Sequence, residues 1–225
     1  MTSETQAVNR TTVLRGLVGW YIGLWCMLAI APYDRQDWLL ENLLAVTVIA
    51  VLFLTFRLFQ FSTLSYVLIT VFLTLHAIGA HYTYAEVPFG FWLQQMLALD
   101  RNPFDRIVHF AYGFLLVYPL REILVRLAGV TGFWSYYLPI SGTVAQSGFF
   151  ELIEALVAIL VNPELGTAYL GTQGDEWDAQ KDMAAALVGA IITMSLLLFS
   201  VRHSPSHEAL ISFDRRREAD CRDGR

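Results

Sequence analysis

The sequence predicts an all-α protein, a bundle of six helices that span a membrane. Hydrophobic residues make up 56% of the 225-residue chain, charged residues only 16%, and the mean hydropathy is +0.49. Such a chain is too apolar for a soluble globular domain. It contains six apolar runs, each long enough to cross a hydrocarbon core of about 30 Å. Because lipid offers the backbone no hydrogen-bond partners, we expect each run to be helical.

The six spans are predicted at residues 14–31, 38–56, 64–84, 104–125, 133–161 and 177–201. They form one domain, 14–201, between a short N-terminal segment, 1–13, and a charged tail, 202–225. The N-terminal segment is polar and five further apolar runs follow the first, so we expect a retained span rather than a cleaved signal peptide. The tail has few large apolar residues, and we expect it to be disordered.

The distribution of basic residues predicts the orientation of the spans. With both termini cytoplasmic, the outer side carries only Arg35, Arg101, Arg106 and Lys181. The inner side carries Arg10, Arg15, Arg57, Arg121, Arg126, Arg202, Arg215, Arg216, Arg217, Arg222 and Arg225. The positive-inside rule favours this choice and so predicts a multi-pass membrane protein with both termini cytoplasmic. The net charge of −5 would argue against a nucleic-acid partner, although it means little in a chain whose charges are sorted by side. We expect no nucleic acid, and membrane lipid is the expected partner of the apolar spans.

Ionisable residues gather in the outer halves of the third and fourth predicted spans. His76 and His81 lie in the outer third of the third span. In the fourth, Asp105, His109 and Tyr112 share one helical face at positions i, i+4 and i+7. Such groups are costly inside a membrane and are usually functional.

The last two predicted spans bring carboxylates to the same level. Glu151 and Glu154 lie one turn apart on the fifth span, and Asp175, Asp178 and Asp182 lead into the sixth. We expect nothing comparable from the first two spans, where Glu41 and Arg57 lie near the ends.

Imidazoles facing carboxylates within a helix bundle indicate a divalent metal site, for Zn, Fe or Mn. The candidate ligands are His76, His81, His109, Asp175, Asp178 and Asp182. Glu151 or Glu154 is the candidate general base, and Asp105, Arg106 and Tyr112 are candidates for contacting substrate. Any one of these histidines taken alone is more often a hydrogen-bonded structural residue, so the hypothesis depends on the cluster.

Four strings resemble the YjdF-like family of bacterial inner-membrane proteins, whose activity is not established. They are His76 to Tyr84 with Val87-Pro88-Phe89-Gly90, Asp105 to Phe110 continuing through Pro119-Leu120-Arg121-Glu122, Glu151-x-x-Glu154, and Gly174-Asp175-x-Trp177-Asp178-x-x-x-Asp182-Met183. The Asp-Arg-x-x-His-Phe segment, the later acidic helix and Gly189 also resemble the VanZ-like group of membrane proteins. These resemblances imply a six-span inner-membrane protein, distantly similar to proteins connected with the cell envelope.

Three functions fit these observations. The first is a metal-dependent hydrolase or transferase that acts on a lipid or cell-envelope intermediate at the outer leaflet. The second is a proton- or cation-coupled transporter, in which the same groups form a relay and Ser141 to Ser147 provide an inner pathway or a helix break. The third is a non-catalytic protein that assembles envelope machinery.

Overall fold

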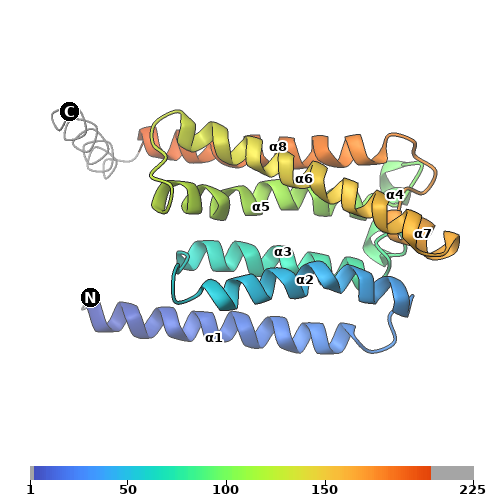
Figure 1. Cartoon of the computed structure of the whole chain (residues 1–225), viewed down its shortest axis with the longest axis horizontal. Coiled ribbons are helices and arrows are strands. Elements are labelled where there is room, and N and C mark those ends of the chain that lie inside the picture. Colours follow the sequence, from blue (N-terminus) through green and yellow to red (C-terminus); the bar gives the residue numbers. More distant parts are fainter. Residues whose placement is uncertain (1–2, 204–225) are drawn as a thin grey trace.

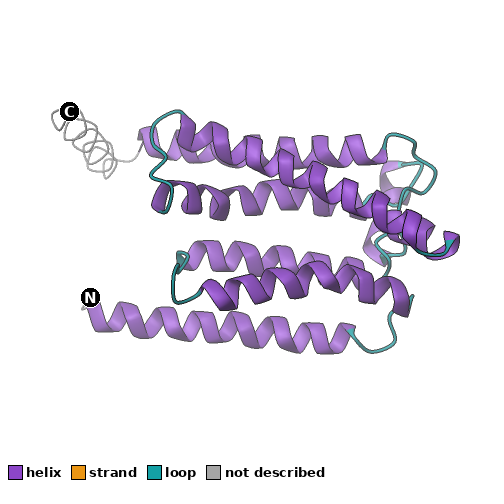
Figure 2. Cartoon of the chain, viewed as in Figure 1, coloured by secondary structure: helices purple, strands orange, loops and turns teal. Residues whose placement is uncertain are grey.

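The computed structural model describes residues 3–203, which form eight helices and contain no strand (Figures 1 and 2). They are α1 (Ser3–Leu28), α2 (Arg35–Thr55), α3 (Thr63–His81), α4 (Pro88–Leu97), α5 (Phe104–Arg126), α6 (Trp134–Leu160), α7 (Pro163–Leu170) and α8 (Asp178–His203). The predicted all-α class is confirmed. Most of the predicted tail, residues 204–225, lies outside the described residues.

Six of the described helices are long and apolar enough to cross a membrane, and they correspond to the six predicted spans. The boundaries differ by a few residues. The first helix begins at Ser3 and its candidate span at Arg10, while the third ends at His81, before a turn that the predicted span includes. Large apolar side chains such as Phe53 and Ile159 are exposed on the long helices, as expected for surfaces that face lipid.

Two short helices occupy segments between the predicted spans. A proline in the first turn begins each of them, Pro88 in α4 and Pro163 in α7, where its missing N–H costs no hydrogen bond. The Asn162 side chain also caps α7 by accepting from the backbone N–H of Leu165. Both helices are too short to span a bilayer, so a search for spans does not find them.

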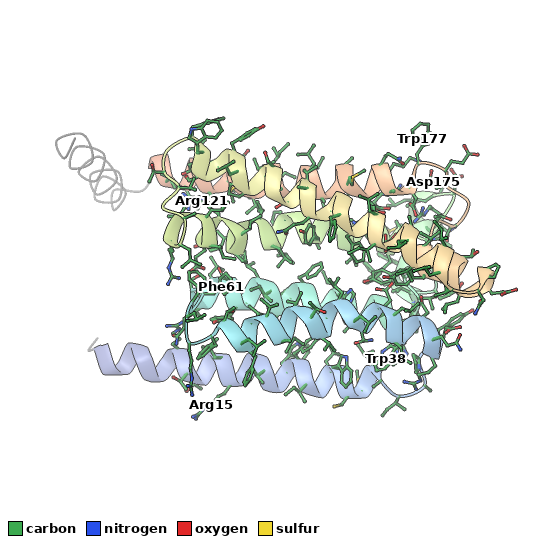
Figure 3. All side chains as sticks on the ribbon, in the orientation of Figure 1. Arg15, Trp38, Phe61, Arg121, Asp175 and Trp177 are labelled. Carbon is green, nitrogen blue, oxygen red and sulfur yellow. The ribbon has the colours of Figure 1, made fainter. Side chains whose placement is uncertain are left out.

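The bundle has two halves that lie side by side (Figure 1). Helices α1, α2 and α3 form one half, and α5, α6 and α8 form the other, with α3 packed against α5. The short helices α4 and α7 lie at one end, which we call the α4–α7 end. Arg15 and Arg121 lie at the opposite end, whereas Asp175 and Trp177 lie at the α4–α7 end (Figure 3).

Helices α5 and α8 touch backbone to backbone. A Cβ atom on Gly113 would lie 1.9 Å from the carbonyl oxygen of Ala186, and one on Gly189 would lie 2.3 Å from that of Phe110. Ala186 and Ala190 are fully buried at the same contact. Small residues allow such close approach in membrane helices. This contact holds the first turns of α8 beside those of α5.

Glu122 joins α5 to the start of α3 at the opposite end. Its carboxylate accepts hydrogen bonds from the backbone N–H of Ser62 at 2.7 Å and the hydroxyl of Ser65 at 2.5 Å, and it pairs with Arg126. These contacts fix the two halves of the bundle against each other.

Candidate functional site

Two arginines and three aspartates form an ion-pair network at the α4–α7 end, which we call the arginine cluster: Arg101, Arg106, Asp175, Asp178 and Asp182. Arg106 Nη2 lies 2.6 Å from Asp178 Oδ1, and Arg106 Nε lies 3.2 Å from Asp182 Oδ1. Arg101 donates to the same oxygen of Asp178 and to the carbonyl oxygen of Thr172. The cluster therefore ties the start of α5 to the start of α8.

Asp175 also pairs with a third cation, Lys181. Lys181 Nζ lies 2.7 and 2.8 Å from its two carboxylate oxygens, and Arg106 lies 3.5 Å away. The hydrogen bond from Lys181 is the main reason that the pKa of the Asp175 carboxyl lies below its usual range. Asp175 and Asp178 are both engaged by cations of this chain.

Beneath the arginine cluster, Asp105, His109 and Asp182 form a group that can hold an ion. Each offers one donor atom, and these three atoms lie within 4.8 Å of one another. Asp105 and His109 are one turn apart on α5, with Asp105 Oδ1 3.6 Å from His109 Nε2, and Asp182 comes from the neighbouring α8. Nitrogen and oxygen ligands bind zinc at roughly 2.0–2.2 Å, so an ion among these three donors would draw them closer together.

Helix α6 adds two carboxylates beside this group. Glu151 Oε1 lies 3.7 Å from His109 Nδ1, so the imidazole stands between Asp105 on one side and Glu151 on the other. Within the described part of the chain, this oxygen of Glu151 is buried and has no hydrogen-bond partner. Glu154, one turn further along α6, lines the cavity described next.

A cavity of about 450 Å³ extends from these side chains along the bundle. Side chains of α2, α3, α5 and α6 line most of it, and the end of α7 closes one part. Its polar end includes Asp105, His109 and Glu154. The rest is largely apolar, with Leu44, Val48, Phe72, Val108, Leu116, Phe149, Phe150 and Ile153. An apolar cavity with a few polar groups at one end is typical of a ligand site.

The expectation that the first two spans bring nothing comparable is wrong, because α2 carries two buried carboxyl groups. Glu41 is 3% exposed and lines the cavity. Asp37, one turn earlier, is fully buried, and neither of its carboxylate oxygens has a hydrogen-bond partner among the described residues. Helix α2 reaches the site because its start packs against α7. The sequence does contain a signal for this pair, because Asp37 and Glu41 are one helical turn apart. The prediction lacks α7, however, and so gives no reason for the start of α2 to lie at the site.

His76 also lines the cavity, and both of its ring nitrogens are hydrogen-bonded. Nε2 lies 3.1 Å from the carbonyl oxygen of Glu41, which can only accept, so Nε2 carries the proton. Nδ1 of the neutral ring then accepts from the Tyr84 hydroxyl at 2.5 Å. In this arrangement His76 has no nitrogen left for an ion.

Tyr84 is not among the predicted site residues, although a strained turn places it in the cavity wall. Thr83 and Tyr84 both have positive φ, 50° and 52°, which is rare outside glycine and costly. A Cβ atom on Gly79 would lie 2.5 Å from the Tyr84 ring, so the ring needs a glycine there. Burial, with the charges of Glu41 and Asp105 behind it, raises the pKa of Tyr84 well above its usual value. Its hydroxyl therefore stays protonated and remains a donor.

The remaining predicted residues fall into two sets. Tyr112 lines the cavity and donates to Gln146 Oε1 at 2.8 Å. His81 donates from Nδ1 to the carbonyl oxygen of Leu28 at 2.7 Å and does not line the cavity. Arg106 is likewise absent from the cavity wall, since its guanidinium lies in the arginine cluster.

Comparison with known proteins agrees with this membrane architecture. Residues 13–203 match the model of a family described as "Predicted membrane protein (DUF2238)". The chain is also 38% identical to the inner membrane protein YjdF of Escherichia coli (strain K12), over 169 residues that cover 75% of this chain and 80% of that protein. No solved structure matches the chain. The resemblance to the VanZ-like group finds no support in these matches. The chain belongs to the DUF2238 family of membrane proteins, which agrees with its predicted resemblance to YjdF.

Proposed function

We propose that this protein is a membrane-embedded, metal-dependent enzyme that hydrolyses or transfers a group on a lipid or cell-envelope intermediate. The observation that carries the proposal is the position of the Asp105, His109 and Asp182 donors, which converge where an apolar cavity of about 450 Å³ has its polar end. An ion at that point would meet the polar group of a molecule whose chain fills the cavity. The similarity to an inner membrane protein supports a place in the inner membrane.

The chemistry of the donors supports a divalent ion. One imidazole and two carboxylates suit Zn, Fe or Mn. Asp182 is 2% exposed and is already paired with Arg106. Three cations, Arg101, Arg106 and Lys181, face four aspartates in and beside the arginine cluster, and a divalent ion would compensate the acid that remains. Asp105 takes the place of His76 in this ligand set, because both nitrogens of His76 are engaged.

Neighbouring residues supply the remaining roles. Glu151 is the best-placed general base, because its Oε1 lies 3.7 Å from His109 and has no hydrogen-bond partner in the described structure. Arg106 donates to Asp182 and so orients a ligand, a role that outer-shell partners of metal sites commonly have. A divalent ion in this group would polarise the substrate and lower the pKa of water toward about 7.

The orientation predicted from the basic residues sets the side on which the reaction occurs. Arg15 and Arg121 lie at the end opposite the site, and with that end cytoplasmic the site opens in the outer half of the membrane (Figure 3). The proposed substrate is therefore a component of the outer leaflet or an intermediate carried there.

The test is turnover of bacterial lipids by the purified protein. Wild-type protein in nanodiscs is incubated with a radiolabelled bacterial lipid extract and Zn, Mn or Fe, and the products are separated by chromatography. We expect Glu151→Gln to keep the ion and to lose about 10²- to 10⁴-fold in rate, the usual contribution of a general base. Glu176→Gln removes an exposed carboxylate near the site and should change little. Turnover that survives both chelation and Asp182→Asn would refute the proposal.

A proton-coupled carrier is the second candidate, and the observation that favours it is Asp37. A fully buried carboxyl without a hydrogen-bond partner in the described chain is typical of a group that holds a proton. Against it, α6 runs unbroken through Pro139 and the predicted inner pathway, so the helix break that a carrier would use is not there. Uptake into vesicles that an uncoupler abolishes, and that Asp37→Asn reduces, would favour the carrier.

A further inference from the structure

We infer that the cavity takes a long-chain amphiphile sideways from the bilayer, through an opening between α2 and α6, and that the polar end of this molecule is a hydrogen-bond donor, an amine or a hydroxyl group. This inference deepens the proposed function by naming how its substrate enters and of what class it is. It rests on three observations: the position of the opening, the lining of the cavity and its charge.

The opening follows from the way in which the helices pack. Helix α2 packs against α3 and α7, and α6 packs against α5, α8 and α7, but α2 and α6 make no extensive contact with each other in the described chain. They are connected through α7 at one end only (Figure 1). Thr47 on α2 and Gln146 and Phe149 on α6 line the cavity and are nevertheless exposed. The cavity therefore reaches the surface between these two helices.

The depth of the opening along the membrane-spanning helices indicates whether it faces lipid or water. Thr47 lies well inside the α2 span, Arg35–Thr55, and Gln146 lies near the middle of the α6 span, Trp134–Leu160. At that depth a membrane-spanning bundle is surrounded by acyl chains rather than by water. A molecule that enters there comes from the bilayer, and the apolar lining from Val48, Leu116 and Ile153 suits its chain. The volume lies within the range of about 300–1,000 Å³ that is usual for small-molecule sites.

The charge of the polar end selects the polar group. Glu41, Asp105 and Glu154 line it, together with two histidines, and no Lys or Arg of the described chain does so. The nearest cations, Arg101 and Arg106, both donate to Asp178 in the arginine cluster. Arg101 also lies 3.7 Å from Asp105, whereas Glu41 and Glu154 form no ion pair among the described residues. A carboxyl group offers an oxygen that accepts hydrogen bonds whether or not it holds a proton, so these residues favour an amine or a hydroxyl, and no cation of the described structure lines the cavity to bind a bare anion.

The experiment is photo-crosslinking of the full-length protein in nanodiscs, after chelation of metals. Four diazirine-tagged compounds are compared: a long-chain primary amine, alcohol and carboxylic acid of equal length, and a short-chain amine. We expect labelled peptides from α2 and α6 with the long amine and the long alcohol. The acid and the short amine should label at least about tenfold less, a difference of about 1.4 kcal/mol, because a carboxylate meets no cation in the described cavity wall and a short chain loses apolar contact.

Matched variants locate the opening. Val48 on α2 and Ile153 on α6 line the cavity on the two helices that flank the opening, and we call this part of the cavity its mouth. Ile153→Trp and Val48→Trp fill space there and should each reduce labelling by the long amine about tenfold, a loss of roughly 1.4 kcal/mol in binding. Ile159→Trp changes an exposed isoleucine on the same helix that does not line the cavity, and it should label like the wild type. Melting temperatures confirm that each variant folds, and the two mouth variants provide independent trials.

The inference is overturned if the acid labels as strongly as the amine, or if filling the mouth changes labelling no more than Ile159→Trp does. Because the labelling is done without metal, its result is independent of the proposed enzyme activity. Labelling without any metal binding would keep this cavity assignment and remove the metalloenzyme. Metal binding without selective labelling would do the reverse.

Discussion

At the scale of single residues, His76 and Tyr84 illustrate how a polar pair is satisfied inside the bundle. The Tyr84 hydroxyl is the only donor among the described residues to His76 Nδ1, and His76 is 2% exposed. The other ring nitrogen donates to the Glu41 carbonyl oxygen, so the pair connects α2, α3 and the turn after α3. Each member therefore stabilises the cavity wall.

Replacing Tyr84 with phenylalanine tests this pair. The variant leaves a buried acceptor on His76 without its donor, which costs about 1–3 kcal/mol. We expect a lower melting temperature for Tyr84→Phe in detergent. Tyr33→Phe removes the hydroxyl of a tyrosine that is 66% exposed and should melt like the wild type. Equal melting temperatures for the two variants would show that the His76–Tyr84 hydrogen bond contributes nothing measurable.

At the scale of elements, the contact of α5 with α8 positions the candidate metal ligands. Gly189→Ala would place a methyl group against the backbone of Phe110, and neither backbone can move aside without separating the two helices. Overpacking usually costs roughly 1–3 kcal/mol of stability, and we expect this variant to lose about 3 kcal/mol or more. We also expect it to bind metal more weakly. Thermal unfolding and metal titration measure the two effects.

The control for this prediction is Gly16→Ala in α1. A Cβ atom there would meet nothing within 4 Å, and alanine suits a helix better than glycine. This variant should be as stable as the wild type or slightly more stable. A destabilisation of similar size in both variants would mean that the close approach of α5 and α8 is not the cause.

The elements also show what could be predicted from the sequence. The six spans were predictable because length and hydropathy determine a membrane helix, and the ligand group was partly predictable because Asp105 and His109 share a face whatever the tertiary structure. The engagement of His76 was not predictable, since it depends on two positive-φ residues in a turn. The contribution of Glu41 was missed because the packing of α2 on α7 is a tertiary contact.

At the scale of the whole molecule, the orientation in the membrane is the main prediction. In a background with Cys26→Ala and Cys221→Ala, Glu176→Cys and Leu127→Cys place exposed thiols at opposite ends of the bundle. A membrane-impermeant maleimide added to spheroplasts should label Glu176→Cys at once and Leu127→Cys only after permeabilisation. The opposite pattern would place the site on the cytoplasmic side.

Across the described bundle, buried acid from α2 and α8 and half-buried acid from α5 and α6 converge on one region, and the proposed cation would compensate part of this charge. The sequence supported a larger ligand set than the three residues that form the group in the structure. His109 and Asp182 belong to both sets, whereas His81 lies against α1 and outside the cavity wall. Variants of His109 and Asp182 should therefore lose a bound ion, whereas a variant of His81 should keep it. This contrast distinguishes the loss of a metal ligand from the general effect of removing a histidine.

The most direct test is elemental analysis of the purified protein beside His109→Ala, Asp182→Asn and His81→Ala. We expect about one divalent ion per chain in the wild type and in His81→Ala, and its loss from both other variants, since each removes a ligand. The metal site is contradicted if the wild type holds no ion even after reconstitution with Zn, Mn and Fe, or if His109→Ala and Asp182→Asn retain it in full.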